Sequence, residues 1–203
     1  MEFSLRRLLS RAPKPGVFAI DEKNGKWSKP ITVPGIWGEG FNWWSLSVTS
    51  VSCTSAGNCA AGGYAGHHPG NEAQPFVVGE VKGKWGQAIT VRGLPALGAG
   101  NVSGSVASVS CAGEGNCAAV GSYFSYEDTY GGDDYPRAFV ETERNGVWRR
   151  AQHLLGIGPT VDPASVSCVS TGDCAIGGYS SADNFPYHDG TPGRPVHAFV
   201  TAP

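Results

Sequence analysis

The sequence has few charged residues, no long apolar run and no extended basic segment. Charged side chains make up 16% of the 203 residues, the formal net charge is −2, and no basic block is longer than Arg6-Arg7 or Arg149-Arg150. A nucleic-acid-binding surface normally needs clustered Lys and Arg, so we predict no nucleic-acid partner. A membrane-spanning helix needs about 20 consecutive apolar residues. No stretch approaches that length, so no transmembrane segment is predicted.

The first 16 residues lack the apolar run of about 7–15 residues that a secretion signal requires. Only Leu8-Leu9 follows the arginine pair in this segment. We therefore expect residues 1–16 to be a disordered leader or a truncated signal. The alternative is a short amphipathic helix on a membrane surface, in which Phe3 and Leu5 join the two leucines.

Motifs that would assign a chemistry are also missing. The sequence has no Gly-x-Ser-x-Gly nucleophile elbow, no phosphate-binding loop, no His-Glu-x-x-His zinc motif and no complete EF-hand loop. We therefore predict no catalytic residue, no cofactor and no dedicated metal site.

A threefold repeat is the main feature that the sequence does contain. Residues 50–64 read SVSCTSAGNCAAGGY, residues 108–123 read SVSCAGEGNCAAVGSY, and residues 165–179 read SVSCVSTGDCAIGGY. Their first cysteines follow one another at intervals of 58 and 57 residues, and all six cysteines lie inside the copies. A repeat of this period predicts an array of one supersecondary unit, such as a propeller.

Each unit predicts four short strands. Strand one carries the SVSC motif, whose small and β-branched residues suit a strand crowded on both faces. Strand two follows the second cysteine and has a glycine at equivalent positions, namely Gly63, Gly121 and Gly178. Strand three is expected to start at Phe76, Phe139 and Phe199, and a tryptophan nine residues after the phenylalanine marks strand four.

A glycine turn precedes each strand-four tryptophan. The turns read Asn24-Gly25-Lys26-Trp27, Lys82-Gly83-Lys84-Trp85 and Asn145-Gly146-Val147-Trp148. Asn-Gly between β segments is a strong hairpin signal, because both residues tolerate positive φ. We expect these tryptophans to pack between neighbouring sheets rather than to stack on a ligand.

These patterns predict a single β-repeat domain over residues 17–203. It consists of a half unit, two complete units and a partial unit, over residues 17–44, 45–102, 103–160 and 161–203. We predict an all-β, propeller-like array of about three four-stranded antiparallel repeats, with a β-trefoil as the alternative fold. Propellers usually have at least about four blades. Three units therefore require a spare strand in the last sheet, a second chain that completes a larger ring as a homodimer, or a longer array.

The cysteine pairs are expected to form disulfides. The members of each pair, Cys53 with Cys59, Cys111 with Cys117, and Cys168 with Cys174, flank a five-residue hairpin loop. Cysteines that face each other across an antiparallel hairpin lie at disulfide distance. Zinc is the competing interpretation, but structural zinc prefers a closer cysteine spacing with a second pair nearby. Disulfides indicate an oxidising compartment, so we expect an extracellular or cell-surface protein.

The repeat resembles that of actinobacterial, secreted, β-propeller-like proteins. The resemblance rests on the pattern SVSC, GNC, GGY, AFV, E and NG-x-W, carried in the first complete unit by Ser52-Cys53, Gly57-Asn58-Cys59, Gly62-Gly63-Tyr64, Phe76-Val77, Glu80 and Gly83-Lys84-Trp85. It covers nearly all of residues 17–203 and implies a propeller-like fold and secretion. It assigns no activity and no catalytic residue.

Ligand binding is expected on the face where the repeats diverge. In an up-and-down blade, the loops between strands two and three and those between strands four and one emerge on one face, and loops on a rigid scaffold commonly bind ligands. These loops cover residues 35–44, 65–75, 124–136 and 180–195. Their aromatic, histidine and aspartate residues are the candidate ligand-binding residues: Trp37, Trp43, Trp44, His67, His68, Tyr126, Asp133, Asp134, Tyr135, Tyr187, His188 and Asp189.

Several functions are compatible with this face. Aromatic rings beside carboxylates suit a module that binds carbohydrate or an extracellular protein. Alternatively, Trp43 and Trp44 simply fill the gap between blades. A glycoside hydrolase would use two of the aspartates as its acid and base, and a metal site would use the pair His67-His68. We expect an extracellular binding or interaction module, with a polysaccharide-active enzyme as the alternative.

Overall fold

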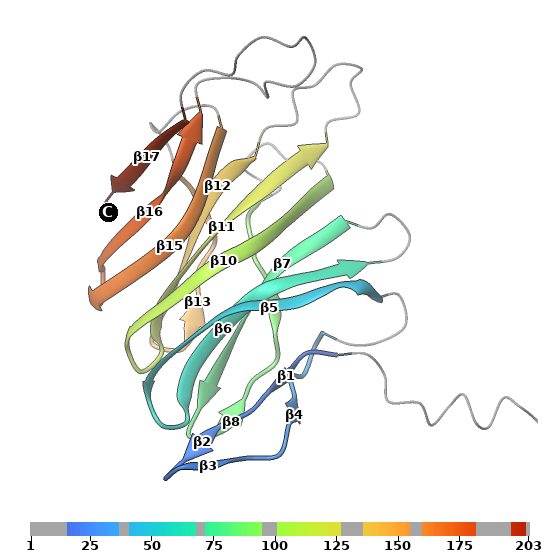
Figure 1. Ribbon diagram of the computed structural model, residues 1–203, viewed down its shortest axis with the longest axis vertical. Coiled ribbons are helices and arrows are strands. Elements are labelled where there is room, and N and C mark those ends of the chain that lie inside the picture. Colours follow the sequence, from blue (N-terminus) through green and yellow to red (C-terminus); the bar gives the residue numbers. More distant parts are fainter. Residues whose placement is uncertain are drawn as a thin grey trace, which may run out of the picture.

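The computed structural model describes residues 16–36, 41–67, 72–94, 101–126, 136–154, 160–181 and 196–201 (Figure 1). Only the backbone is described at several strand ends, including residues 41–45, 67, 125 and 126. All regular elements in these ranges are β-strands, and all their pairings are antiparallel. The all-β prediction is therefore confirmed.

The strands fall into four groups that follow the sequence repeat. The leading half unit has β1 (Phe18–Ala19), β2 (Glu22–Lys23), β3 (Lys26–Trp27) and β4 (Ile31–Thr32). The first unit has β5 (Phe41–Ser55), β6 (Asn58–His67), β7 (Glu72–Val81), β8 (Lys84–Trp85) and β9 (Ile89–Thr90). The second unit has β10 (Asn101–Gly113), β11 (Asn116–Tyr126), β12 (Arg137–Arg144), β13 (Val147–Trp148) and β14 (Gln152–His153). The third unit has β15 (Thr160–Ser170), β16 (Asp173–Ser181) and β17 (Val196–Thr201).

Each complete unit is a meander in which consecutive strands pair. The order is β5-β6-β7-β8 in the first unit and β10-β11-β12-β13 in the second. The predicted strand four is interrupted, because β9 also pairs with β7 and β14 also pairs with β12. Strand three begins before the predicted phenylalanine, at Glu72, Arg137 and Val196. The closure of the units into a ring stays a prediction.

The three predicted disulfides are confirmed. They join Cys53 to Cys59, Cys111 to Cys117 and Cys168 to Cys174, with Cα–Cα distances of 3.9, 4.0 and 4.0 Å. Each closes a hairpin between strands one and two, since the paired cysteines face each other in the ladder. In the chain-entropy model a loop this short contributes about 2 kcal/mol, so each bond mainly fixes the register of its hairpin.

The predicted glycine turns are also confirmed. Asn24, Lys82 and Asn145 have φ of 53°, 51° and 52°, and the glycine after each has φ of 76°. Positive φ at both central residues is the geometry of the two-residue hairpin turn. In both complete units this turn is tied to the disulfide hairpin, since Gly83 N donates to Gly57 O and Gly146 N donates to Gly115 O, each at 2.9 Å. The disulfide end of each complete unit is thus cross-braced.

The serines of the SVSC motif join successive units. Their hydroxyl oxygens accept hydrogen bonds from strand-one amides of the next unit, at 2.9 Å from Val109 N to Ser50 Oγ, 3.0 Å from Cys111 N to Ser52 Oγ, 3.2 Å from Val166 N to Ser108 Oγ, and 3.0 Å from Cys168 N to Ser110 Oγ. The residue numbers increase together along both partners, so β5, β10 and β15 run in the same direction. We call these contacts the serine bonds; they satisfy amides that would otherwise lack a partner between the sheets.

The core lies between the sheets rather than within one. The largest buried cluster joins the first and second units through residues such as Val77, Leu94, Val106, Phe139 and Trp148. A second cluster joins the leading half unit to the first unit, and a smaller third cluster joins the second unit to the third. Burial of these apolar faces stabilises the array by roughly 25 cal/mol per Å² of apolar surface removed from water. Each unit therefore depends on its neighbours for its core.

Candidate functional site

The two ends of each sheet differ in construction. The disulfide hairpins and the glycine turns lie at one end, as described above. The strand pairs reach the opposite end at Phe41↔His67, Asn101↔Tyr126 and Thr160↔Ser181. Because β5, β10 and β15 run in the same direction, these three ends point the same way (Figure 1). We call this the open end; it is the end from which the divergent segments of the sequence leave the strands.

Four of the candidate ligand-binding residues lie on the described backbone at the open end. Trp43 and Trp44 lie in β5, His67 is the last residue of β6, and Tyr126 is the last residue of β11. The other eight lie outside the described residues: Trp37, His68, Asp133, Asp134, Tyr135, Tyr187, His188 and Asp189. The structure thus brings the backbones of the four to one end of the array.

A bulge in β5 contains the tryptophan pair. Asn42 pairs with Gly66 and Leu46 pairs with Ala65, so residues 43–45 have no counterparts on β6. Extra residues of this kind re-aim side chains and are frequent near binding sites. The corresponding parts of β10 and β15 pair without such an insertion near the open end. The bulge is therefore specific to the first unit.

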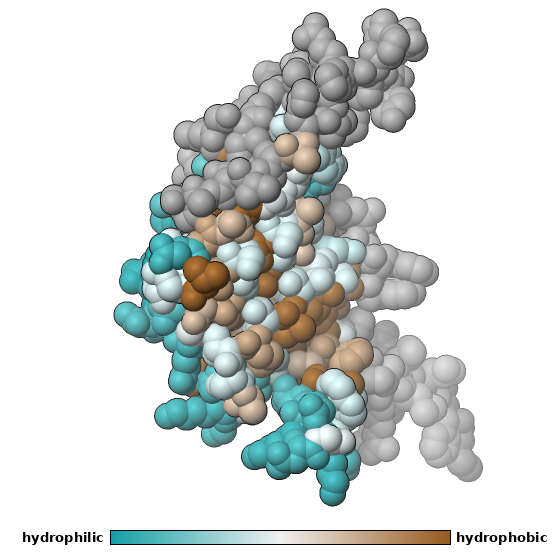
Figure 2. All heavy atoms as spheres, turned by 60° about the vertical axis from the view of Figure 1, so that its left-hand side comes forward, coloured by the Kyte–Doolittle hydropathy of each residue, from teal (hydrophilic) through white to brown (hydrophobic). Residues whose placement is uncertain are grey.

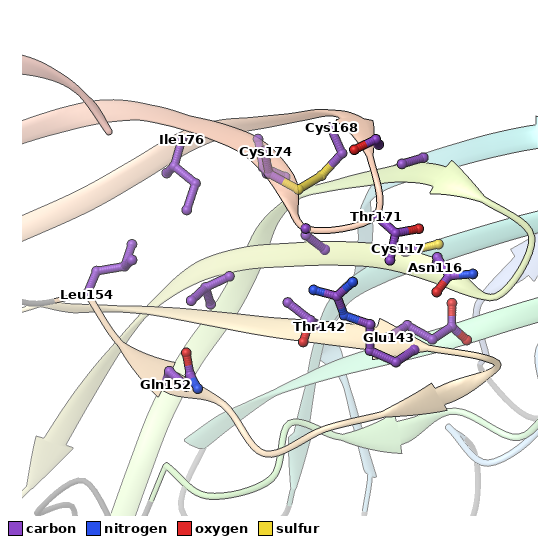
Figure 3. Close-up of a pocket in the computed structure, with 17 residues that line it drawn as sticks. Asn116, Cys117, Thr142, Glu143, Gln152, Leu154, Cys168, Thr171, Cys174 and Ile176 are labelled. Carbon is purple, nitrogen blue, oxygen red and sulfur yellow. A yellow bond between two sulfur atoms is a disulfide. The ribbon is translucent and has the colours of Figure 1, made fainter. Parts of the chain in front are cut away.

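A groove lies between the second and third units, at the disulfide end, and the sequence analysis did not predict it. Its volume is about 290 Å³. Figure 3 shows Leu154 and Ile176 on its walls together with the Cys168–Cys174 disulfide, while Thr142 and Glu143 supply polar groups. We call it the inter-unit groove. An apolar floor with a few polar groups at its edge suits an apolar or aromatic side chain.

A second and larger groove lies between the leading half unit and the first unit. Its volume is about 590 Å³, and its walls include Phe18, Trp27, Val48, Val51 and Trp85. Of these side chains Phe18 is 61% exposed, Trp27 72% and Val51 60%. We call it the leading groove. It presents an apolar surface with no cover among the described residues.

Several buried carboxyl groups have raised pKa values. Burial raises the pKa of Glu141 to about 8, although nearby Arg92 opposes the shift. Burial also raises the pKa of Glu143, which lines the inter-unit groove. The pKa of Glu80, at the equivalent position of the first unit, is raised by burial and then by the charge of Asp21. These shifts follow from packing between the sheets, away from the open end.

The described part of the chain offers neither a metal cluster nor a membrane-spanning helix. Within it, no three His, Cys, Asp or Glu side chains are grouped so that they could hold a metal ion. No helix long and apolar enough to cross a membrane occurs in the same ranges. The candidate sites are thus the open end and the two grooves.

No protein-family model and no curated protein matches the chain. The candidate sites are accordingly assigned from sequence and geometry alone.

Proposed function

We propose that the chain is an extracellular carbohydrate-binding module whose ligand binds at the open end. The observation that carries this proposal is the β5 bulge, which places Trp43 and Trp44 outside regular pairing beside the end of β6. Aromatic rings supply flat apolar surfaces for sugar rings at a low cost in conformational entropy. The aspartates and tyrosines that the sequence has in its divergent segments would supply the hydrogen bonds.

The rest of the fold supports a binding scaffold. Disulfides, glycine turns and serine bonds fix the sheets near the disulfide end, and the same strands continue to the open end. Binding sites positioned by such elements lose little entropy when they bind. Three disulfides are compatible with an extracellular location, which the resemblance to secreted repeat proteins also implies.

The alternative is a polysaccharide-active enzyme. Glycoside hydrolysis generally needs two carboxyl groups about 5–10 Å apart across the scissile bond. The described carboxyl groups with raised pKa values, Glu80, Glu141 and Glu143, are buried between the sheets. They therefore do not favour this alternative, and the experiment below includes it as an outcome.

A glycan array tests the proposal. The purified full chain is expected to bind at least one class of polysaccharide fragment without releasing reducing sugar. The Trp43→Ala and Trp44→Ala variants are each expected to bind roughly tenfold more weakly, as is usual for a central aromatic contact. The matched control is Val147→Ala, because Val147 is 52% exposed and belongs to a glycine turn at the opposite end.

Three results would contradict the proposal. Binding to no glycan on the array removes the carbohydrate class and leaves a protein ligand as the surviving interpretation. Release of reducing sugar replaces the module by an enzyme. Full binding by both tryptophan variants, with the folded state retained in circular dichroism, moves the site away from the β5 bulge.

A further inference from the structure

The strand-four tryptophans occupy the junctions between units. Trp85 packs against the cluster between the leading half unit and the first unit. Trp148 is 5% exposed and belongs to the cluster between the first and second units. Trp27, the third member of the series, is 72% exposed on the leading half unit. Trp148, which is buried, and Trp85, which is partly buried, each lie at the junction that precedes their own unit, and no described residue covers Trp27.

The inter-unit groove is the counterpart of the Trp148 site. The repeat relates Val140, Val166 and Ile176 in the groove to Val77, Val109 and Ala119 in the cluster that contains Trp148. Nothing in the described part of the third unit corresponds to Trp148 itself. The groove therefore has the walls of a tryptophan site but lacks the tryptophan (Figure 3).

The outer edge of β15 carries two serines that correspond to those of the serine bonds. Ser165 and Ser167 are exposed, and no described residue donates a hydrogen bond to them. In the repeat, the strand-one amides equivalent to the donors of the serine bonds belong, at the opposite edge of the array, to Val51 and Cys53 of β5. No described serine accepts a hydrogen bond from either of these two amides. The Val51 side chain is 60% exposed and lines the leading groove. One edge thus offers acceptors and the other edge offers donors.

Apolar side chains also reach the surface on both outer units. Val169 and Tyr179 of the third unit are 85% and 45% exposed, and Phe18 and Ile20 of the leading half unit are 61% and 38% exposed. Figure 2 shows brown, hydrophobic residues at the surface among weakly polar ones on the side of the molecule that carries the third unit. Apolar surfaces of this kind commonly mark interaction sites.

We propose that two copies of this chain assemble head to tail, with Trp27 of each copy seated in the inter-unit groove of the other. In this assembly Ser165 and Ser167 accept hydrogen bonds from the amides of Val51 and Cys53 of the second copy. The occupant is a copy of this chain because both contacts repeat ones already made twice inside it: the serine bonds and the packing of Trp85 and Trp148.

Two copies satisfy both ends at once. Each copy gives one tryptophan and receives one, so a twofold-symmetric dimer leaves neither edge exposed. Two copies of the three described units would make a ring of six, within the range of about 4–8 blades that propellers use, whereas three copies would exceed it. In the completed sheet, the hairpin β2–β3 of one copy would lie beside β17 of the other copy, as β13 lies beside β12 in the second unit. Since β1 and the middle of β17 hold equivalent positions, only one of them pairs with β16 in the completed sheet.

Mass in solution tests the assembly. Light scattering of the full chain is expected to give about 42 kDa, twice the 21.1 kDa of one chain. Trp27→Arg and Ser167→Arg are each expected to shift the mass to that of one chain, with dimer dissociation constants raised at least about 100-fold, as for loss of a central interface residue. Both positions are exposed in the single chain, so the fold is expected to survive. Val147→Arg, on an exposed turn outside both grooves, is the control and is expected to stay dimeric.

A mixing experiment identifies the head-to-tail geometry. Trp27→Arg and Ser167→Arg chains are expected to pair with each other, because their heterodimer retains one unaltered interface. If the wild-type protein keeps the mass of one chain at every concentration up to about 1 mM, the dimer has a dissociation free energy below about 4 kcal/mol and the proposal is overturned. Dimers that persist in both variants, or variants that do not pair when mixed, would also overturn it. Glycan binding is measured on the dissociated variants as well. If they still bind glycan, the loss of the dimer is separate from the proposed function.

Discussion

Replacement of Gly121 by alanine is expected to reduce the free energy of unfolding by about 3 kcal/mol or more, a large share of the stability of a typical domain. A Cβ atom at this position would lie 2.0 Å from Ser105 O and 2.8 Å from Phe139 Cζ. The first neighbour is backbone of the paired strand and the second is a fully buried ring, so neither can move freely. The register of β10 shifts next to this position, between Val106, which pairs with Gly121, and Ser108. Urea denaturation of the two proteins measures the difference.

Gly113→Ala is the matched control for this prediction. A Cβ atom there would meet nothing within 4 Å, so its effect is expected to stay within about 0.5 kcal/mol. Gly63 and Gly178 lie as close to the backbone of their paired strands as Gly121 does, since Cβ atoms there would lie 1.9 Å from Ser47 O and 2.3 Å from Asp162 O. A Gly121→Ala protein as stable as the Gly113→Ala protein would show that strands one and two are not packed as described.

The second large effect concerns pH. Glu141 is fully buried, and neither carboxylate oxygen has a hydrogen-bond partner of good geometry among the described residues. Burial raises its pKa from 4.5 to about 8, so the folded chain favours the protonated form. The stabilising effect of this protonation is complete below pH 4.5, where the unfolded chain also binds the proton, and is lost as the pH rises to about 8. The free energy of unfolding is therefore expected to fall as the pH rises through this window.

Glu141→Gln is expected to remove most of this dependence. The variant should exceed the wild type in stability at pH 8 by several kcal/mol, since one pKa unit corresponds to about 1.4 kcal/mol. At pH 4 the two proteins should be nearly equal. Glu80 and Glu143 have pKa values shifted in the same direction and would leave a residual slope. Glu114→Gln, at an exposed position, is the control; equal stability of Glu141→Gln and wild type at pH 8 would contradict the account.

Local patterns predicted much of the fold. Paired cysteines with a five-residue spacing predicted the three hairpins, and the Asn-Gly sequence predicted the turn before Trp148. These features depend on neighbours in sequence, so one chain suffices to recognise them. The interruption of strand four was not predicted, because two-residue segments such as Gln152–His153 are too short to show an alternation of apolar and polar residues.

The contacts between units were harder to predict. The SVSC serines were interpreted as small residues in a crowded strand. In the structure, four of them accept hydrogen bonds from backbone amides of the next unit. The sequence does not show whether a serine hydroxyl faces solvent or the backbone of a neighbouring strand, so sequence alone does not separate the two cases. The packing of the strand-four tryptophans was predicted and holds for Trp85 and Trp148, but Trp27 is exposed. The exposed Trp27 is the side chain that we propose to fill the inter-unit groove of a second copy.

Hydrogen exchange at the strand-one amides tests most directly that serine bonds join the units. In the full chain the amides of Val109, Cys111, Val166 and Cys168 are expected to be protected. In a Ser50→Ala, Ser52→Ala double variant the first two are expected to exchange about fivefold faster, because a hydrogen bond contributes roughly 1 kcal/mol, while the other two keep their rates. Unchanged exchange at Val109 and Cys111 in the folded double variant would contradict the account.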